Sequence, residues 1–156
     1  MFTNIDGWAI DIVQQFFENE GYTVTVTENP YDNVDLVDIN GKYAIEVKGR
    51  KEEYLAKNIK DNMLDVPKYN LIMNAVDQRK YKAVYLCNVF KDNTFYLNNI
   101  LKDEPMNTNV KDISKTTYFE NKEKQPKQCF YYNPKITVTY TPTDDGRYTF
   151  TKTENY

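Results

Sequence analysis

The stretch that decides the fold is VDLVDINGKYAIEVK, residues 34–48. Its two apolar runs are rich in Val, Ile and Leu, a composition that is typical of strands. Between them stands Asn40-Gly41, a dipeptide typical of a two-residue type I′ turn in which both residues take a positive φ. The stretch therefore predicts a β-hairpin.

This turn sets the register of the hairpin by counting outward. Val37 pairs with Ala44, and Asp35 lies opposite Glu46 on strands roughly 5 Å apart. Lys48 follows Glu46 by two residues and shares its face of the sheet. The other face carries apolar side chains that we expect to pack: Val34, Leu36, Tyr43, Ile45 and Val47. Two facing carboxylates destabilise a sheet unless something lies between them, and a divalent cation is the obvious candidate.

An ordinary interpretation of the same residues is a surface ladder of salt bridges, which contributes at most about 1 kcal/mol. The face itself argues against it, because Val37, Ile39 and Ala44 make it more than a polar exterior. Asp38 is the rival metal ligand. Alternation places Asp38 on the opposite face near the turn, where we expect a solvated acid.

The composition fits one domain of 156 residues with an apolar core, since 40% of the residues are hydrophobic and 28% are charged. The chain has no histidine, which excludes Ser-His-Asp and Cys-His catalysis and His-ligated zinc. Two cysteines are too few for a disulfide framework and lack a Cys-x-x-Cys spacing. Because no apolar run is long enough to span a membrane and no secretion signal is visible, we expect a cytoplasmic protein without a membrane partner.

The net charge is −3, but the charged residues are distributed unevenly along the chain. Residues 1–47 contain nine acidic residues and one lysine, a balance of −8, whereas residues 48–82 have a balance of +4. An acidic metal pocket beside a basic strip would suit a phosphate substrate, although exposed helices also carry lysines for solubility. Arg50 and Lys51 directly follow the hairpin, so they are the candidate nucleic-acid contacts.

The remaining pattern predicts further elements on both sides of the hairpin. An amphipathic helix spans residues 4–19, Gly21 ends it, and a half-buried strand covers residues 22–27. The later elements are, in order, helices at 51–62 and 65–78, a buried strand at 83–90, its hairpin partner at 94–97, an irregular segment over 101–134, and a hairpin with strands at 136–140 and 148–150. We therefore expect a core over residues 1–100, on which residues 101–156 pack within a single domain.

The order helix, strand, strand with Asp, turn, strand with Glu-x-Lys, helices and strand resembles the core of the PD-(D/E)XK nuclease superfamily. That superfamily includes restriction endonucleases and archaeal-type Holliday-junction resolvases. The matching residues are Asp35 for the first acid and Glu46-Val47-Lys48 for the second acid and the lysine. The resemblance implies an α/β fold with a restriction-endonuclease-like core, in which helices flank a mixed central sheet, extended here by the C-terminal β-hairpin.

The resemblance also implies a set of site residues. Asp35 and Glu46 would hold Mg²⁺, or Mn²⁺ as a substitute, together with the backbone carbonyl of Val47. Lys48 would orient or deprotonate the attacking water, or hold the phosphate. Many members carry a further acid on the first helix; Ile10 stands at the corresponding position here, and Asp11, one residue away, is the additional candidate.

These observations predict a Mg²⁺-dependent endonuclease that hydrolyses phosphodiester bonds of DNA. The abundance of Asn, Lys, Tyr and Ile suggests an AT-rich genome, such as that of a phage or mobile element. The oligomeric state stays open and includes a homodimer. Two alternatives stay open as well: a catalytically silent module of the same fold that binds DNA or inhibits a host defence enzyme, and a structural domain in which the motif arose by chance.

Overall fold

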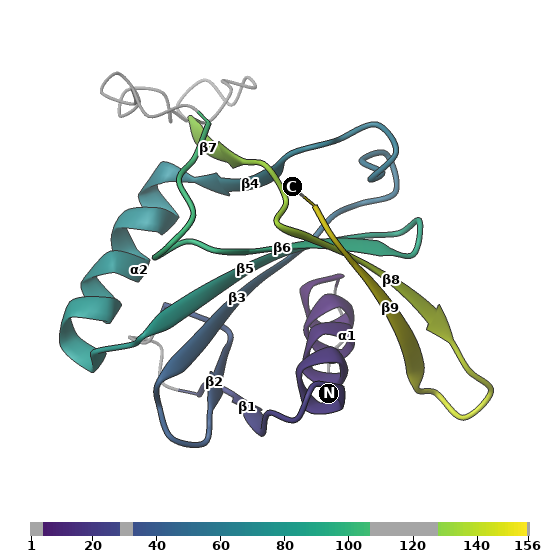
Figure 1. Ribbon diagram of the computed structural model, residues 1–156, viewed down its shortest axis with the longest axis horizontal. Coiled ribbons are helices and arrows are strands. Elements are labelled where there is room, and N and C mark those ends of the chain that lie inside the picture. The colour runs from purple at the N-terminus through teal and green to yellow at the C-terminus, as the bar shows by residue number, and fades with distance from the viewer. Residues whose placement is uncertain (1–4, 29–32, 107–127, 156) are drawn as a thin grey trace.

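The computed structural model describes residues 5–28, 33–106 and 128–155 (Figure 1). The elements are α1 (Ile5–Asn19), β1 (Val24–Val26), β2 (Leu36–Asp38), β3 (Tyr43–Gly49), β4 (Asn62–Asp65), α2 (Val66–Arg79), β5 (Ala83–Phe90), β6 (Thr94–Asn99), β7 (Cys129–Tyr132), β8 (Ile136–Pro142) and β9 (Tyr148–Glu154). Seven strands form the main sheet in the order β1-β2-β3-β5-β6-β8-β9, and β4 pairs with β7 in a second sheet.

The main sheet is mixed. β3 and β5 run parallel, and the other neighbouring strands run antiparallel. A parallel pair needs a crossover connection, and here β4 and α2 supply it. The α/β class and the C-terminal β-hairpin are confirmed, and the fold is restriction-endonuclease-like. The predicted order of elements holds except that β4 replaces the helix expected at 51–62 and β7 was not expected. The division of the chain at residue 100 stays a prediction, and the sheet runs across that boundary through the pairing of β6 with β8.

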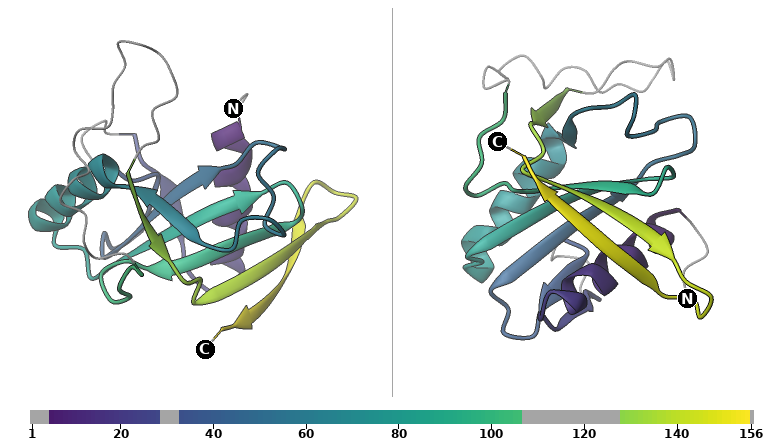
Figure 2. Two further views of the ribbon diagram at one scale, coloured as in Figure 1. Left: turned by 90° about the horizontal axis from the view of Figure 1, so that it is seen from above. Right: turned by 45° about the vertical axis from the view of Figure 1, so that its right-hand side comes forward.

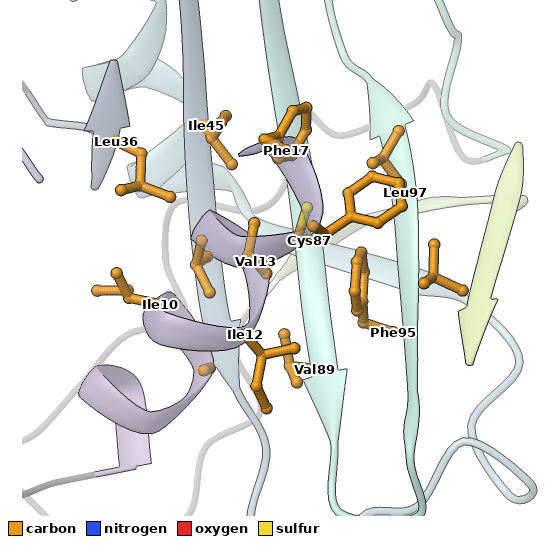
Figure 3. Packing of buried hydrophobic residues seen from close by; sticks show 14 of the residues in the cluster. Ile10, Ile12, Val13, Phe17, Leu36, Ile45, Cys87, Val89, Phe95 and Leu97 are labelled. Atoms are coloured by element: carbon orange, nitrogen blue, oxygen red, sulfur yellow. The ribbon is translucent and has the colours of Figure 1, made fainter. Parts of the chain in front are cut away.

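Each face of the main sheet is covered by a different set of elements. α1 lies on one face, whereas α2 and the β4–β7 sheet lie on the other (Figure 1). α2 and the β8–β9 hairpin lie at opposite ends of the molecule (Figure 2). Ile10, Ile12 and Val13 of α1 point at the strands and pack among side chains such as Ile45 and Phe95 (Figure 3). The amphipathic pattern of residues 4–19 therefore predicted the buried face of α1 correctly.

The register of the β2–β3 hairpin is the predicted one. Val37 pairs with Ala44, and Leu36 pairs with Ile45. Leu36 and Ile45 are buried against α1, as expected for the packing face. Val34 is an exception, because it precedes the first residue of β2 and packs in the cluster on the α2 side of the sheet.

The turn of this hairpin differs from the predicted type I′ turn. Gly41 has a φ of 71°, but Asn40 does not have a positive φ. The Gly41 N–H donates to the Asp38 carbonyl, and one carboxylate oxygen of Asp38 accepts the N–H groups of Lys42 and Tyr43 at 2.6 and 2.8 Å. Asp38 is therefore a buried turn-stabilising acid and not the solvated acid that we expected.

One further expectation about the middle of the chain was wrong, and one strand pairing was not expected. Residues 51–61 form a series of turns instead of a helix. The Asp92 carboxylate accepts the N–H groups of Ala56 and Lys57, and the Tyr96 hydroxyl donates to the carbonyl of Ile59, so distant side chains stabilise an irregular path. The pairing of β4 with β7 was also missed, since its partners are more than sixty residues apart in the chain. Most of the expected irregular segment lies outside the described residues.

α2 has the boundaries that its capping residues indicate. The Asp65 carboxylate accepts the N–H of Lys68, and Pro67 stands in the first turn, where its missing N–H costs nothing. Ile72 and Ala75 are the buried residues of α2. Neither helix of the described chain is long and apolar enough to cross a membrane.

Candidate active site

A cavity of about 450 Å³ lies where β2 begins, beside the second half of β3. Five structural segments contribute to its wall: the first turn of α1, the residue before β2, the end of β3, β4 with the start of α2, and β5. The lining residues are Asp6, Asp35, Glu46, Val47, Lys48, Arg50, Met63, Leu64, Asp65, Lys68 and Leu86. The structure thus brings together five residues that the sequence placed in the site: Asp35, Glu46, Val47, Lys48 and Arg50.

Asp35 and Glu46 face each other because of the hairpin register. The paired positions of β2 and β3 end at Leu36 with Ile45, and Asp35 lies one residue before β2, where its N–H donates to the Ile45 carbonyl at 3.0 Å. Leu36 and Ile45 point toward α1, so Asp35 and Glu46 point to the opposite face. The Val47 N–H donates to Oδ2 of Asp35 at 2.8 Å. A strand residue presents its N–H and C=O to the same edge, and the Val47 carbonyl therefore points toward Asp35 as well.

The environment of the two carboxyl groups favours their protonated forms. Burial raises the pKa of Glu46 well above its ordinary value, and the Asp35 carboxylate raises it further. Burial also raises the pKa of Asp35, against the lowering effects of the Val47 N–H and of Lys68. Oε1 of Glu46 is buried and has no hydrogen-bond partner among the described residues. A buried acceptor without a donor is costly, and a cation between the two carboxylates would remove that cost.

Lys68 is a basic residue of the cavity whose position beside Glu46 the sequence interpretation did not predict. Its Nζ lies 3.7 Å from Oε2 of Glu46, and its charge lowers the pKa of both Glu46 and Asp35. It stands in the first turn of α2, three residues after the cap residue Asp65. The helix expected at residues 65–78 located this turn, but only the pairing of β4 with β7 and the packing of α2 on the sheet bring it to Glu46.

The basic residues at the end of β3 and just after it differ in their relation to the cavity. Lys48 is exposed and lines the cavity, as its shared face with Glu46 predicts. Arg50 is half-buried, burial lowers its pKa, and its Nε donates to the side-chain oxygen of Asn88 at 2.7 Å. Lys51 is exposed and does not line the cavity. Arg50 is therefore held at the cavity, whereas Lys51 lies outside it.

The acid that α1 contributes is Asp6, not Asp11. Asp6 lines the cavity and accepts the N–H of Gly49 at 3.3 Å. Asp11 is exposed, lies within 3.4 Å of the Gln15 amide, and adds to the rise in the pKa of Tyr148 in β9. Asp11 was the candidate because it stands one residue from Ile10, but the structure places it outside the cavity. Asp6 lies four residues before Ile10, which places it on the same helix face one turn earlier.

The donor set fits a hard cation with a small number of protein ligands. Mg²⁺ commonly uses one or two carboxylates and keeps several waters, and Asp35, Glu46 and the Val47 carbonyl match this pattern. Within the described ranges, no group of three or more His, Cys, Asp or Glu residues is arranged to hold a metal ion. Asp6 therefore lines the cavity without joining the two facing carboxylates in such a group.

No protein-family model matches the chain, and no curated protein matches it. Among solved structures, the chain is similar to Hjc, a Holliday junction resolvase of the archaeal hyperthermophile Archaeoglobus fulgidus. The two share 14% sequence identity with a TM-score of 0.46, over 78% of this chain and 84% of that one.

Proposed function

We propose that this protein is a metal-dependent nuclease that hydrolyses phosphodiester bonds of DNA. The proposal rests on one observation: Asp35 and the buried Glu46 face each other at a cavity, and Oε1 of Glu46 has no hydrogen-bond partner among the described residues. A salt-bridge ladder on a solvated surface would not bury a carboxylate in this way. The abundance of Asn, Lys, Tyr and Ile is the support for a phage or mobile-element origin.

The residues of the cavity would have different roles in the reaction. Asp35, Glu46 and the Val47 carbonyl would hold Mg²⁺ or Mn²⁺. When bound, the ion lowers the pKa of a water and neutralises charge on the phosphate. Lys48 is exposed to solvent at the cavity wall, where it would hold the phosphate or orient the attacking water. Arg50 would contact a neighbouring phosphate of the strand.

Metal capture is the direct test of the site. Calorimetric titration with Mn²⁺ is expected to give a binding heat with the wild type and none with Asp35→Ala. Asp11→Ala removes an exposed acid outside the cavity and serves as the control. Equal heats for the wild type and Asp35→Ala would contradict the metal site.

Turnover needs a separate measurement. Purified protein is incubated with plasmid, single-stranded and four-way-junction DNA in Mg²⁺ or Mn²⁺. Lys48→Ala is expected to lower the cleavage rate by about 100-fold or more, because it removes a group that acts at the reacting atoms. Lys82→Ala, an exposed lysine at the other end of the sheet strands, is the control. If Lys48→Ala cleaves every substrate as the wild type does, the catalytic role is wrong.

One observation favours a second candidate, a silent module that binds DNA or a host defence enzyme without turnover. Lys68 already supplies a positive charge 3.7 Å from Glu46. An internal cation can neutralise the acidic pair without a metal. This candidate predicts no cleavage by the wild type and undiminished DNA binding by Asp35→Ala/Glu46→Ala. Cleavage that this double variant abolishes would exclude it.

A further inference from the structure

A second, larger cavity of about 870 Å³ lies on the other side of the turns formed by residues 51–61. Four exposed lysines line it: Lys57, Lys60, Lys102 and Lys135. They come from three separate segments, namely the turns after β3, the end of β6 and the start of β8. We call this cavity the lysine cleft.

The four ammonium groups have no partner within the described part of the chain, where no hydrogen bond or ion pair involves them. Three acids also line the lysine cleft, and two of them accept N–H groups of the protein while keeping their charge. Asp92 accepts the N–H groups of Ala56 and Lys57, and Asp103 accepts the side-chain amide of Asn98 and the N–H of Asn99. Only Glu104 is an exposed acid of the lining. The four lysines therefore outnumber the three acids of the lining by one charge, and their ammonium groups have no partner among the described residues.

A chain of buried side-chain hydrogen bonds joins the lysine cleft to the candidate active site. Arg50 donates to Asn88, Asn88 to Asn62, Asn62 to Asn98, and Asn98 to Asp103, over 2.7, 2.6, 2.8 and 2.9 Å. The three asparagines are at most 1% exposed and come from β5, β4 and β6. Arg50 lines the candidate active site, and Asn98 and Asp103 line the lysine cleft. Because a satisfied buried network is rigid, the two cavities hold a fixed position relative to each other.

We infer that the lysine cleft binds the phosphodiester backbone of a DNA strand at a distance from the bond that is cleaved. Four cations spread over a cavity of this size exceed what one small anion can contact, and they suit several phosphates of one polymer. Lysine contacts to phosphate position a strand without reading its sequence. The inference extends the proposed function, because it gives the DNA substrate a second site of contact.

The test compares two double variants that remove the same charge. Lys57→Ala/Lys60→Ala alters the lysine cleft, whereas Lys42→Ala/Lys82→Ala alters two exposed lysines at the start of β3 and β5. Binding of a duplex and a single-stranded oligonucleotide is measured in EDTA over a range of salt concentrations, so hydrolysis cannot interfere. For duplex DNA, the slope of log affinity against log salt is expected to become shallower by about 1.8 in the cleft variant, with an affinity loss of roughly tenfold at low salt. The control variant is expected to keep the wild-type slope.

The outcomes separate this inference from the proposed function. If both double variants bind as the wild type does, or lose affinity equally, the lysine cleft is not a DNA site, whatever the protein cleaves. If the cleft variant alone loses affinity while the wild type cleaves nothing in Mg²⁺ or Mn²⁺, the inference holds and the nuclease proposal fails. Lys102→Glu/Lys135→Glu gives an independent check, with an expected loss larger than that of the alanine pair. Polyglutamate that competes as strongly as DNA at equal charge would overturn the assignment to nucleic acid.

Discussion

Glu46 binds protons more readily in the folded chain than in the unfolded chain when no cation is present. Burial is the main cause and the Asp35 carboxylate is the second, so the pKa lies above the ordinary 4.5. The folded state therefore holds more protons over the pH range that starts near 4.5. In that range the free energy of unfolding decreases as the pH rises, and the loss is complete above the folded-state pKa.

Glu46→Gln removes this titration while keeping the shape of the side chain. In EDTA at pH 7, the variant is expected to melt at a higher temperature than the wild type, because no charge is buried. The advantage is expected to disappear below pH 4.5, where Glu46 is protonated in both states. Thermal melts across pH 3.5 to 8 provide the measurement, in roughly half-unit steps. Parallel curves for the two proteins would show that Glu46 is not desolvated.

Asp6 is the acid of α1 that lines the cavity, a position for which the sequence interpretation named Asp11. It lines the cavity and bonds to the Gly49 N–H, whereas Asp11 faces the β8–β9 hairpin. Asp6→Asn is expected to weaken Mn²⁺ affinity roughly 10–100-fold, the usual effect of losing a charge that supports metal ligands. Asp11→Asn is expected to leave it unchanged. Calorimetry on both variants decides, and the reverse ranking would restore the original assignment.

At the scale of elements, sequence patterns predicted the structure correctly where neighbouring residues determine it. The alternation around Asn40-Gly41 predicted the pairing of Val37 with Ala44, and the helix expected at residues 65–78 closely matches α2. The turn type was wrong because the Asp38 side chain bonds to the turn and allows a longer loop of the same register. The residues that pair across a hairpin are fixed by the position of the loop's centre and not by its length. A shorter and a longer loop with the same centre therefore give the same pairs, and Asp35 faces Glu46 in both cases.

Non-local contacts explain what the sequence did not reveal. The turns at 51–61 depend on Asp92 and Tyr96, and the position of Lys68 at Glu46 depends on α2 packing over the sheet. A single sequence shows which residues are able to bond but not which distant partner they meet. The motif residues of the site were predictable because one hairpin brings them together, whereas Asp6 and Lys68 come from other elements.

Gly49 connects α1 to the candidate active site through a close contact. A Cβ at this position would lie 2.6 Å from the Ile5 carbonyl oxygen and 3.1 Å from the Cβ of Ala9. Gly49→Ala therefore forces the first turn of α1, which carries Asp6, away from β3. We expect a loss of about 1–3 kcal/mol in the free energy of unfolding together with weaker Mn²⁺ binding.

Gly21→Ala is the matched control for this prediction. Gly21 has a φ of 100° and nothing within 4 Å of a built Cβ, so its replacement costs backbone strain alone, about 1 kcal/mol. Chemical denaturation and Mn²⁺ calorimetry are applied to both variants. If Gly49→Ala binds Mn²⁺ as tightly as Gly21→Ala does, the position of α1 does not matter for the site.

At the scale of the whole molecule, the β8–β9 hairpin completes the core on the α1 side. Val138 and Tyr140 are buried in the same cluster as Phe16 and Phe95. Gln15 of α1 also accepts the N–H of Tyr148 at 3.1 Å, which ties the first helix to the last strand. The C-terminal hairpin is therefore part of the structure that stabilises the candidate active site, although it contributes no residue to the cavity wall.

Two neighbouring positions on β8 test this role. Val138→Asp places a carboxylate in a fully buried position and is expected to cost more than about 3 kcal/mol. Thr139→Asp introduces the same charge on the exposed face of the strand and is expected to stay within about 0.5 kcal/mol of the wild type. Urea unfolding followed by circular dichroism compares them. Similar midpoints would mean that the hairpin is not integrated into the core.

The position of β9 has a mechanical consequence. It is the outermost strand of the main sheet and pairs with β8 alone. A pulling force applied just after Glu154 breaks these hydrogen bonds one after another, beginning at the pair of Glu154 with Ile136. Peeling β9 also uncovers Phe16, whose ring packs against Phe150 at a centroid distance of 5.5 Å. An ATP-driven unfoldase that pulls on the chain just after Glu154 therefore meets little resistance at first and exposes the core early.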